Sequence, residues 1–246
     1  MSEQNKKKNT EQNVKTETVS GSIHPLNRVI SDIVEIFSEM GFEVATGTEI
    51  EDEKHNFDDL NVPKDHPARD MQDTFWLKDF PGHLMRTHTS GVQIHYMKEN
   101  QPPFKIVAPG KVYRYEATDK THEVQFHQIE GLVVGKGINL GHLKKALNTF
   151  VKKFYGDDVE TRLRPGYFPF VEPGVEVDMK RGDGDWIEML GAGMVHPNVL
   201  KNCGLDSEEY SGFAFGIGLD RVAMLKYGID DVRKFYDGDL RMINQF

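Results

Sequence analysis

The chain has 246 residues, which suits one large domain or two small ones, and its formal net charge is −9 at pH 7. Phosphate neutralisation supplies most nucleic-acid affinity, so a chain this acidic can hold nucleic acid only through a local patch or a partner. The N-terminus lacks the apolar segment of a secretory signal, and no apolar run approaches the roughly 20 residues that span a bilayer. The chain has one cysteine, Cys203, so an internal disulfide is excluded. We therefore expect a cytoplasmic protein, with Cys203 as a small buried residue.

The first part of the chain predicts a tail, a helix and a loop. Residues 1–21 are polar and predict a disordered tail. Pro25 then opens a run of apolar residues at helical spacing, which Gly41 ends. A short strand, "FEVATG", follows, and the acidic, irregular residues 49–73 predict a long loop.

Strand patterns dominate the middle of the chain. The segment "KIVAPGKVYRYE" predicts two strands joined by a turn at Pro109 and Gly110, and "EVQFHQIEGLVVG" predicts another. Residues 140–155 are amphipathic and predict a helix, four further strand patterns follow, and helix returns after Gly218. Many strands with few helices between them predict an α+β fold, an antiparallel sheet flanked by helices.

Several predicted strands carry polar and aromatic side chains on one face, because residues two apart in a strand point the same way. These sets are Arg114 with Glu116; Phe126 with Gln128 and Glu130; and Phe168 with Phe170 and Glu172. Such a face fits a pocket for a polar, planar ligand, although a solvated sheet face gives the same pattern. His88 and Ser90 in "RTHTS" are expected to hydrogen-bond a ligand, since no G-x-S-x-G elbow is present.

Two segments resemble the signatures of class II aminoacyl-tRNA synthetases. "VYRYE" resembles motif 2, an Arg-x-Glu on an antiparallel strand, and "GFAFGIGLDRVAML" resembles motif 3, G-x-G-x-x-R. "DMQDTFWL", "RTHTS", "FPFVEPG" and "GAGMVHP" extend the resemblance to the catalytic domain of phenylalanyl-tRNA synthetase alpha subunits, from about His24 to Phe246. Residues 22–246 would then form that domain, and the polar tail would stand where the family usually has a coiled coil.

The resemblance implies a two-step ligase reaction. Phenylalanine and ATP would give phenylalanyl-adenylate and pyrophosphate, with Mg²⁺ as the metal, and the aminoacyl group would pass to tRNA(Phe). It also implies a beta subunit as the partner, an (αβ)₂ heterotetramer, and no membrane association. Whether the chain is active without that partner is left open.

The resemblance also implies roles for individual residues. The nucleotide would contact Arg114, which holds the α-phosphate, and Glu116, His122, Phe126 and Arg221. The phenylalanine pocket would consist of Trp76, His88, Ser90, Gln93, Gln128, Glu130, Phe168, Phe170, Ala214 and Gly216. Gln128 and Glu130 would bind the ammonium group, and Ala214 would set the depth at the para position of the ring. Glu172 and Glu188 would be the Mg²⁺ ligands.

Two alternatives stay open at this stage. One is a related class II ligase for another amino acid, such as phosphoserine or pyrrolysine; a phosphoserine site would need cations where Phe168 and Phe170 stand. The other is a non-catalytic paralogue that keeps the fold. Such paralogues tend to lose the ATP-binding arginines, whereas Arg114 and Arg221 are both present.

Overall fold

The computed structural model of the chain describes residues 21–69 and 73–246. The predicted disordered tail, residues 1–21, lies outside this part of the chain apart from Gly21. Within the described residues, no helix combines the length and the apolar character that crossing a membrane requires.

The strands in chain order are β1 (Glu43–Val44), β2 (Ile50–Asp52), β3 (His83–Met85), β4 (Phe104–Tyr113), β5 (Gln125–Gly135), β6 (Val159–Phe168), β7 (Val171–Arg181), β8 (Ile187–Val195) and β9 (Ser211–Gly218). The α-helices are α1 (Pro25–Glu39), α2 (Ser90–Glu99), α3 (Leu140–Tyr155), α4 (Pro197–Asn202), α5 (Leu219–Tyr227) and α6 (Leu240–Ile243). Three short helices of other types are η1 (Lys54–Asp58), η2 (Pro67–Arg69) and η3 (Val232–Phe235).

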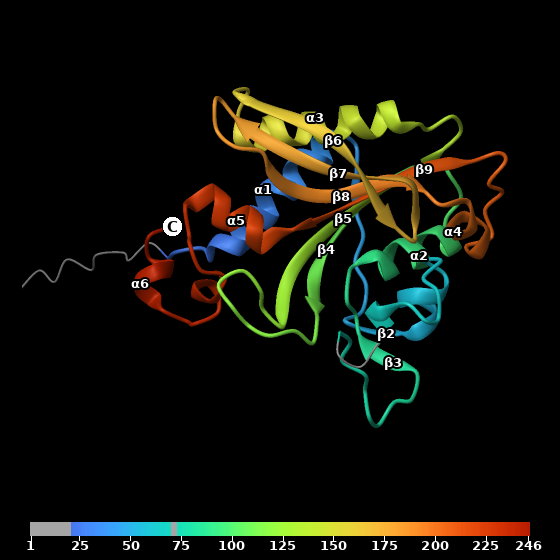
Figure 1. Cartoon of the computed structure of the whole chain (residues 1–246), viewed down its shortest axis with the longest axis horizontal. Helices are drawn as coiled ribbons and strands as arrows, with labels where there is room; N and C mark the ends of the chain where they lie inside the picture. Colours follow the sequence, from blue (N-terminus) through green and yellow to red (C-terminus); the bar gives the residue numbers. More distant parts are fainter. Residues whose placement is uncertain (1–20, 70–72) are drawn as a thin grey trace, which may run out of the picture.

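A seven-stranded sheet in the order β1-β4-β5-β9-β8-β7-β6 forms the centre of the molecule, as Figure 1 shows. Its neighbouring strands are antiparallel except β1 and β4. Strands β2 and β3 form a separate antiparallel pair below it in Figure 1. The predicted α+β architecture is confirmed, and so are the helices at residues 25–39 and 140–155.

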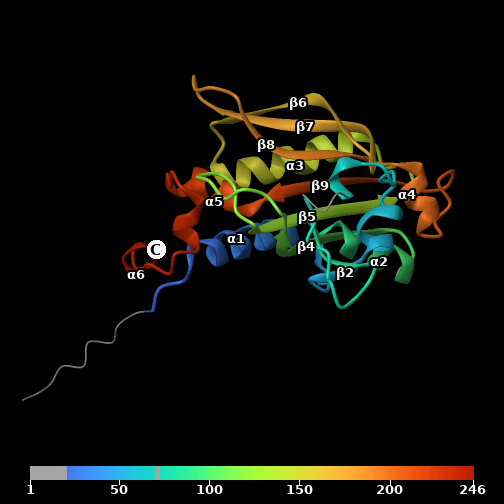
Figure 2. The same ribbon diagram turned by 60° about the horizontal axis from the view of Figure 1, so that its bottom comes forward.

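The sheet separates two apolar cores. On one face α1, α3 and α5 pack against the strands, with Phe37, Phe150 and Phe215 forming a run of stacked rings. On the other face α2, α4 and η1 cover β4, β5 and β9 (Figure 2). Alternate residues of β5 face opposite ways: Ile129 belongs to the first core and Leu132 to the second. The second face carries the candidate site.

The predicted turn at Pro109 and Gly110 is wrong, because β4 runs without a break from Phe104 to Tyr113. Strand β1 pairs only with Ile106 and Val107, so beyond that point β4 has a neighbour on one side alone. An edge position of this kind is where a sheet tolerates proline.

The predicted long loop over residues 49–73 holds β2, η1 and η2 in its described part, and it buries Phe57 and Leu60 in the second core. Helix α2 is absent from the sequence prediction. Its residues from Ser90 to Ile94 are all buried, so it shows no single apolar stripe with a polar opposite face. The buried position of Cys203 is confirmed, and burial raises its thiol pKa to about 12.

Candidate active site

A cavity of about 310 Å³ opens on the sheet face that α2 and α4 cover, beside the hairpin between β6 and β7. The sequence singled out many of its lining residues: His88, Ser90, Gln93, Arg114, Gln128, Glu130, Phe168, Phe170, Ala214 and Gly216. The fold therefore brings ten of the predicted site residues around one space. They come from β5, β6, β9, α2 and the segments that follow β3, β4 and β6.

Glu130, on β5, is a buried carboxylate in the wall of this cavity, with 5% of its surface exposed. Ser90 Oγ donates to its Oε2 at 2.6 Å, and Gln93 Nε2 donates to the same atom at 2.7 Å. Burial raises the pKa of Glu130 to about 7, because a carboxylate loses its hydration there. A desolvated carboxylate held in one position favours a cationic ligand such as an ammonium group.

Two polar atoms of the cavity lining are buried without a hydrogen-bond partner among the described residues: Gln128 Oε1 and His88 Nδ1. Buried polar groups are seldom left unpaired, because each unmade bond costs about 1–3 kcal/mol. Burial, reinforced by the charge of Arg114, lowers the pKa of His88 to about 3. His88 is therefore a neutral imidazole, and it and Gln128 are available to a polar ligand.

An aromatic wall lies on the β6–β7 side. The rings of Phe168 and Phe170 are stacked with centroids 6.0 Å apart. Phe168 lies directly against Gly191 of β8, where a Cβ atom would come within 2.8 Å of its ring. Only glycine lets the ring lie so close to the sheet. Ala214 of β9 contributes a small side chain to the same cavity.

The shared-face prediction for Phe168, Phe170 and Glu172 is only partly right. The chain does not continue as one strand there: β6 ends at Phe168, a turn holds Pro169 and Phe170, and β7 starts at Val171. Both rings reach the cavity, whereas Glu172 is exposed. The alternation rule fails because the chain reverses direction within the segment.

A second cavity of about 310 Å³ shares His88, Arg114 and Phe170 with the first and includes Glu116. Arg114 is exposed; its Nε donates to the carbonyl oxygen of Thr87 at 3.3 Å, and its guanidinium lies 5.0 Å from the centre of the Phe126 ring. Arg114 therefore lies beside Phe126 and in the same cavity lining as Glu116. The predicted strand does not extend through "RYE": β4 ends at Tyr113, so Arg114 and Glu116 follow the strand and do not share a face of it. A guanidinium between two cavities can contact anionic groups in both.

Phe126 lines neither cavity and reaches them only through Arg114. Three further predicted residues also line neither cavity. Trp76 pairs with Leu84 and has its ring 6.4 Å from Phe57, so it packs beside the β2–β3 pair and lines neither cavity. His122 is exposed in the loop between β4 and β5, where Asp119 binds it at 3.0 Å. Arg221 is exposed in the first turn of α5.

The two predicted Mg²⁺ ligands are not brought together. Glu188 of β8 is opposite Asp178 of β7, and Glu172 lies six residues earlier on β7, roughly 20 Å away at the usual rise of a strand. Glu172 instead pairs with His196 at 3.2 Å, and Glu188 pairs with Arg164 at 3.4 Å. One ion cannot bind both carboxylates, because the turn after β6 sets Glu172 at the opposite end of the sheet from Glu188.

Sequence reasoning missed two groups of residues near the site. Leu60, Met97 and Val199 line the cavity but look like ordinary core residues in the sequence. A network behind Arg221 was also missed: Asp220 accepts from the backbone N–H of His127 at 2.7 Å and from the hydroxyl of Tyr236. No local spacing links these three positions, since the fold alone brings them together.

Comparisons with known proteins agree on one family. The family model described as "tRNA synthetases class II core domain (F)" matches residues 9–246. The phenylalanine–tRNA ligase alpha subunit of Dehalococcoides mccartyi (strain BAV1) is 53% identical over 244 residues, covering 92% of this chain and 70% of the relative. That of Xylella fastidiosa (strain 9a5c) is 54% identical over 230 residues, covering 92% of this chain and 68% of the relative.

The solved structure of pyrrolysyl-tRNA synthetase from Desulfitobacterium hafniense superposes with a TM-score of 0.68. The match covers 87% of this chain and 74% of that one, at 16% sequence identity. At this identity the likeness shows a common fold.

Proposed function

This chain belongs to the family of phenylalanine–tRNA ligase alpha subunits, and from that premise we propose that it activates phenylalanine with ATP and transfers the product to tRNA(Phe). Residues 22–246 are the catalytic domain in this proposal. The observation that carries it is the cavity in which the buried Glu130 lies near two stacked phenylalanine rings, with Arg114 in its lining. A carboxylate, an aromatic wall and a guanidinium match the ammonium, ring and reacting carboxylate of one amino acid.

The amino-acid half of the site binds and orients phenylalanine. The substrate ammonium pairs with Glu130, which Ser90 and Gln93 hold in place, and donates to the unpaired oxygen of Gln128. The substrate ring packs on Phe168 and Phe170, where aromatic pairs contribute about 0.5–1.5 kcal/mol beyond burial. Ala214 and Gly216 border the ring, and neutral His88 faces the carboxylate end.

The nucleotide half of the site neutralises charge during adenylation. A carboxylate oxygen of phenylalanine attacks the α-phosphorus, the bond to the bridging oxygen of pyrophosphate breaks, and pyrophosphate leaves with that electron pair. Arg114 stabilises the negative charge that builds on the α-phosphate. Phe126 and Arg221 pack on the two adenine faces, Glu116 accepts from the adenine amino group, and His122 contacts the outer phosphates.

We propose Mg²⁺ as the companion of ATP, since it prefers a carboxylate or two together with phosphate oxygens. The geometry of Glu172 and Glu188 does not fit one ion held by both. Each can supply a single exposed carboxylate, and none of the binding and charge-neutralising steps above depends on either of them.

We further propose a beta subunit as the partner, in an (αβ)₂ heterotetramer located in the cytoplasm. The name of the relatives implies a second kind of subunit. The net charge of −9 also supports a partner, because an acidic chain offers little attraction for the tRNA backbone.

Pyrophosphate exchange with a panel of amino acids tests the proposal, measured for the chain alone and with its beta subunit. Exchange should depend on L-phenylalanine. Exchange with another amino acid instead would contradict it and favour a related ligase. Absence of exchange, together with no binding of a phenylalanyl-sulfamoyl adenylate analogue in the presence of the beta subunit, would favour a non-catalytic paralogue.

A further inference from the structure

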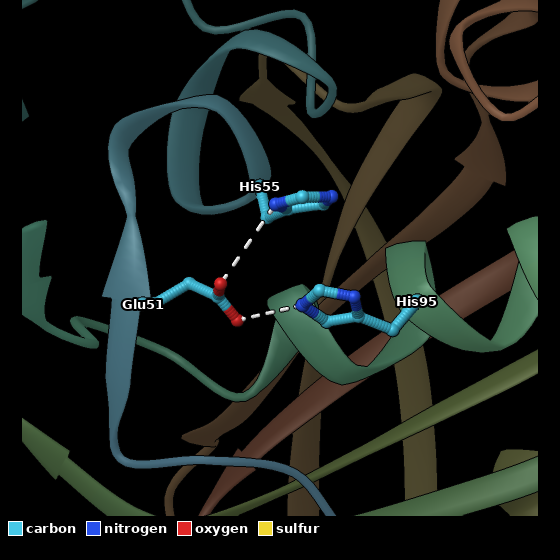
Figure 3. A group of neighbouring side chains, drawn as sticks. All are labelled: Glu51, His55 and His95. Atoms are coloured by element: carbon cyan, nitrogen blue, oxygen red, sulfur yellow. Dashed lines mark hydrogen bonds and ion pairs between the residues drawn. The ribbon is translucent and has the colours of Figure 1, made fainter. Parts of the chain in front are cut away.

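Three side chains from separate elements converge away from the cavities. Glu51 comes from β2, His55 from η1 and His95 from α2. Each offers one ligand atom, and these atoms all lie within 4.8 Å of one another, the only such group of three among residues 21–69 and 73–246. Figure 3 shows the Glu51 carboxylate with the two imidazole rings beside it.

The distances suit a shared cation. His95 Nε2 lies 3.0 Å from Glu51 Oε2, and His55 Nδ1 lies 3.9 Å from Glu51 Oε1 (Figure 3). The two imidazole rings are stacked with centroids 4.2 Å apart, so both lie beside the same carboxylate. An imidazole binds a metal in the plane of its ring, so the exposed His95 ring must turn out of the stack when the ion binds. Asp52 is not a member of this group of three; its Oδ1 lies 2.8 Å from the same Nδ1 of His55, so it competes with an ion for that atom.

The Glu51 carboxylate is buried, with 7% of the residue exposed, and it fits tightly against α2. A Cβ atom at Gly91 would lie 2.9 Å from Glu51 Oε2, so a glycine is what lets the carboxylate approach the helix. The side chain of His95 is 41% exposed and leaves a way in from solvent. The cluster is therefore a partly enclosed set of two imidazole nitrogens and one carboxylate.

Lys98 is the main competitor for this arrangement. Its Nζ lies 2.9 Å from His55 Nε2 and 2.6 Å from Asp59 Oδ2. An ion bound at His55 Nδ1 requires the proton of that ring on Nε2, which then no longer accepts from Lys98. Lys98 keeps Asp59 as its partner in that state, so the cost is its exposed hydrogen bond to His55 and the hydrogen bond between His55 Nδ1 and Asp52.

We propose that Glu51, His55 and His95 bind one Zn²⁺ ion per chain. Two imidazoles and one carboxylate are a ligand set typical of Zn²⁺, which completes its tetrahedron with a water molecule. The ion ties β2 and η1 to α2. Because α2 carries Ser90 and Gln93, the ion stabilises the helix that holds Glu130 without touching the substrate.

The zinc site is tested by titrating Zn²⁺ into the metal-free complex of this chain with its beta subunit. His95→Arg is the key variant. Arginine can keep an ion pair with Glu51 but cannot bind zinc. We expect the wild type to bind one more Zn²⁺ per alpha chain than His95→Arg does, with Kd near or below about 1 µM. Zinc should raise the melting temperature of the wild type only, while the two proteins melt alike in chelator. His142→Gln, which alters an exposed histidine on α3, is the matched control and should bind like the wild type.

X-ray absorption at the zinc edge supplies a second readout, independent of activity. It should show nitrogen and oxygen neighbours at about 2.0–2.2 Å and no sulfur. Equal zinc uptake by the wild type and His95→Arg would overturn the proposal. So would a Kd weaker than about 100 µM for the wild type. In either case the contact between His95 and Glu51 would be a simple ion pair and not part of a metal site.

Discussion

The two halves of the candidate active site differ in how firmly the fold holds them. On the amino-acid side Ser90, Gln93 and Glu130 are each at most 5% exposed and are joined by hydrogen bonds. On the nucleotide side Arg114, His122 and Arg221 are all exposed, and His122 belongs to a surface loop. The first half is preorganised in the free protein, whereas the second has side chains free to close on a ligand.

This difference assigns specificity and rate to different residues. A rigid buried pocket loses little entropy on binding, so it discriminates between amino acids by fit and by desolvation. Exposed arginines contribute most when charge builds on the phosphate, because only then does their interaction strengthen. Substitutions in the two halves should therefore change different kinetic constants.

Replacing Arg114 with alanine should have the largest effect. Pyrophosphate exchange should fall about 10²–10³-fold, the usual loss when one donor to a developing anion is removed. The fold should survive, because within the described part of the chain this exposed side chain makes one hydrogen bond, to the carbonyl of Thr87 at 3.3 Å. Arg241→Ala removes an exposed arginine that pairs with Asp239 and should leave exchange unchanged. An Arg114→Ala enzyme that keeps a tenth of the wild-type activity would contradict the different roles assigned to the two halves of the site.

The second largest effect should come from Ala214→Gly, which should change the preference between phenylalanine and para-substituted phenylalanines. Removal of the methyl group deepens the cavity, and kcat/KM for para-chlorophenylalanine relative to phenylalanine should rise about tenfold or more. The measurement is exchange kinetics with both amino acids. KM for ATP should stay constant, because Ala214 lines the first cavity only. An unchanged ratio would show that Ala214 does not border the para position of the substrate ring.

The affinity for phenylalanine should depend on pH through Glu130. Its pKa is about 7 in the free protein, and the ammonium group needs the ionised form, so affinity should fall about tenfold from pH 8 to pH 6. A pKa raised above the unfolded value also means that the ligand-free protein loses stability as the pH rises through 7. Calorimetric titration at several pH values measures the first effect, and a flat profile would show that Glu130 does not bind the ammonium.

Tyr236→Phe should have the smallest effect and should act on the nucleotide side alone. The Tyr236 hydroxyl donates to Asp220, the residue before Arg221, and it also contacts His127 Nδ1 at 3.1 Å. The substitution removes both contacts, each worth about 0.5–1.5 kcal/mol, and only part of that loss reaches Arg221, so KM for ATP should rise about two- to tenfold. KM for phenylalanine should stay constant. An equal rise in both constants would mean that Tyr236 supports the whole fold instead.

The same comparison explains how far the sequence could predict the site. Gln128 and Glu130 share a face of β5 because the strand is regular, so alternation alone placed them together. The resemblance to motif 2 singled out Arg114 and Glu116, which directly follow β4 and both line the second cavity. Regular strands and motif spacing are local properties, which a sequence carries directly.

The failures occur where distant segments meet or where the chain turns. Helix α2 is buried along most of its first half, so its apolar pattern has no period that marks a helix. The turn at Pro169 reverses the chain and separates Glu172 from the cavity that Phe168 lines. The placement of Trp76 beside Phe57 depends on tertiary packing of the segment around β2 and β3.

The pairing of Glu130 with the substrate ammonium is the central claim, and a double-mutant cycle tests it most directly. Calorimetry would compare L-phenylalanine with 3-phenylpropionate, which lacks the ammonium group, on the wild type and on Glu130→Gln. The wild type should prefer phenylalanine by about 10–100-fold, in line with about 1.5–3 kcal/mol for a charged hydrogen bond, and the variant should lose that preference. A Glu130→Gln protein that still prefers phenylalanine to the same degree would contradict the account.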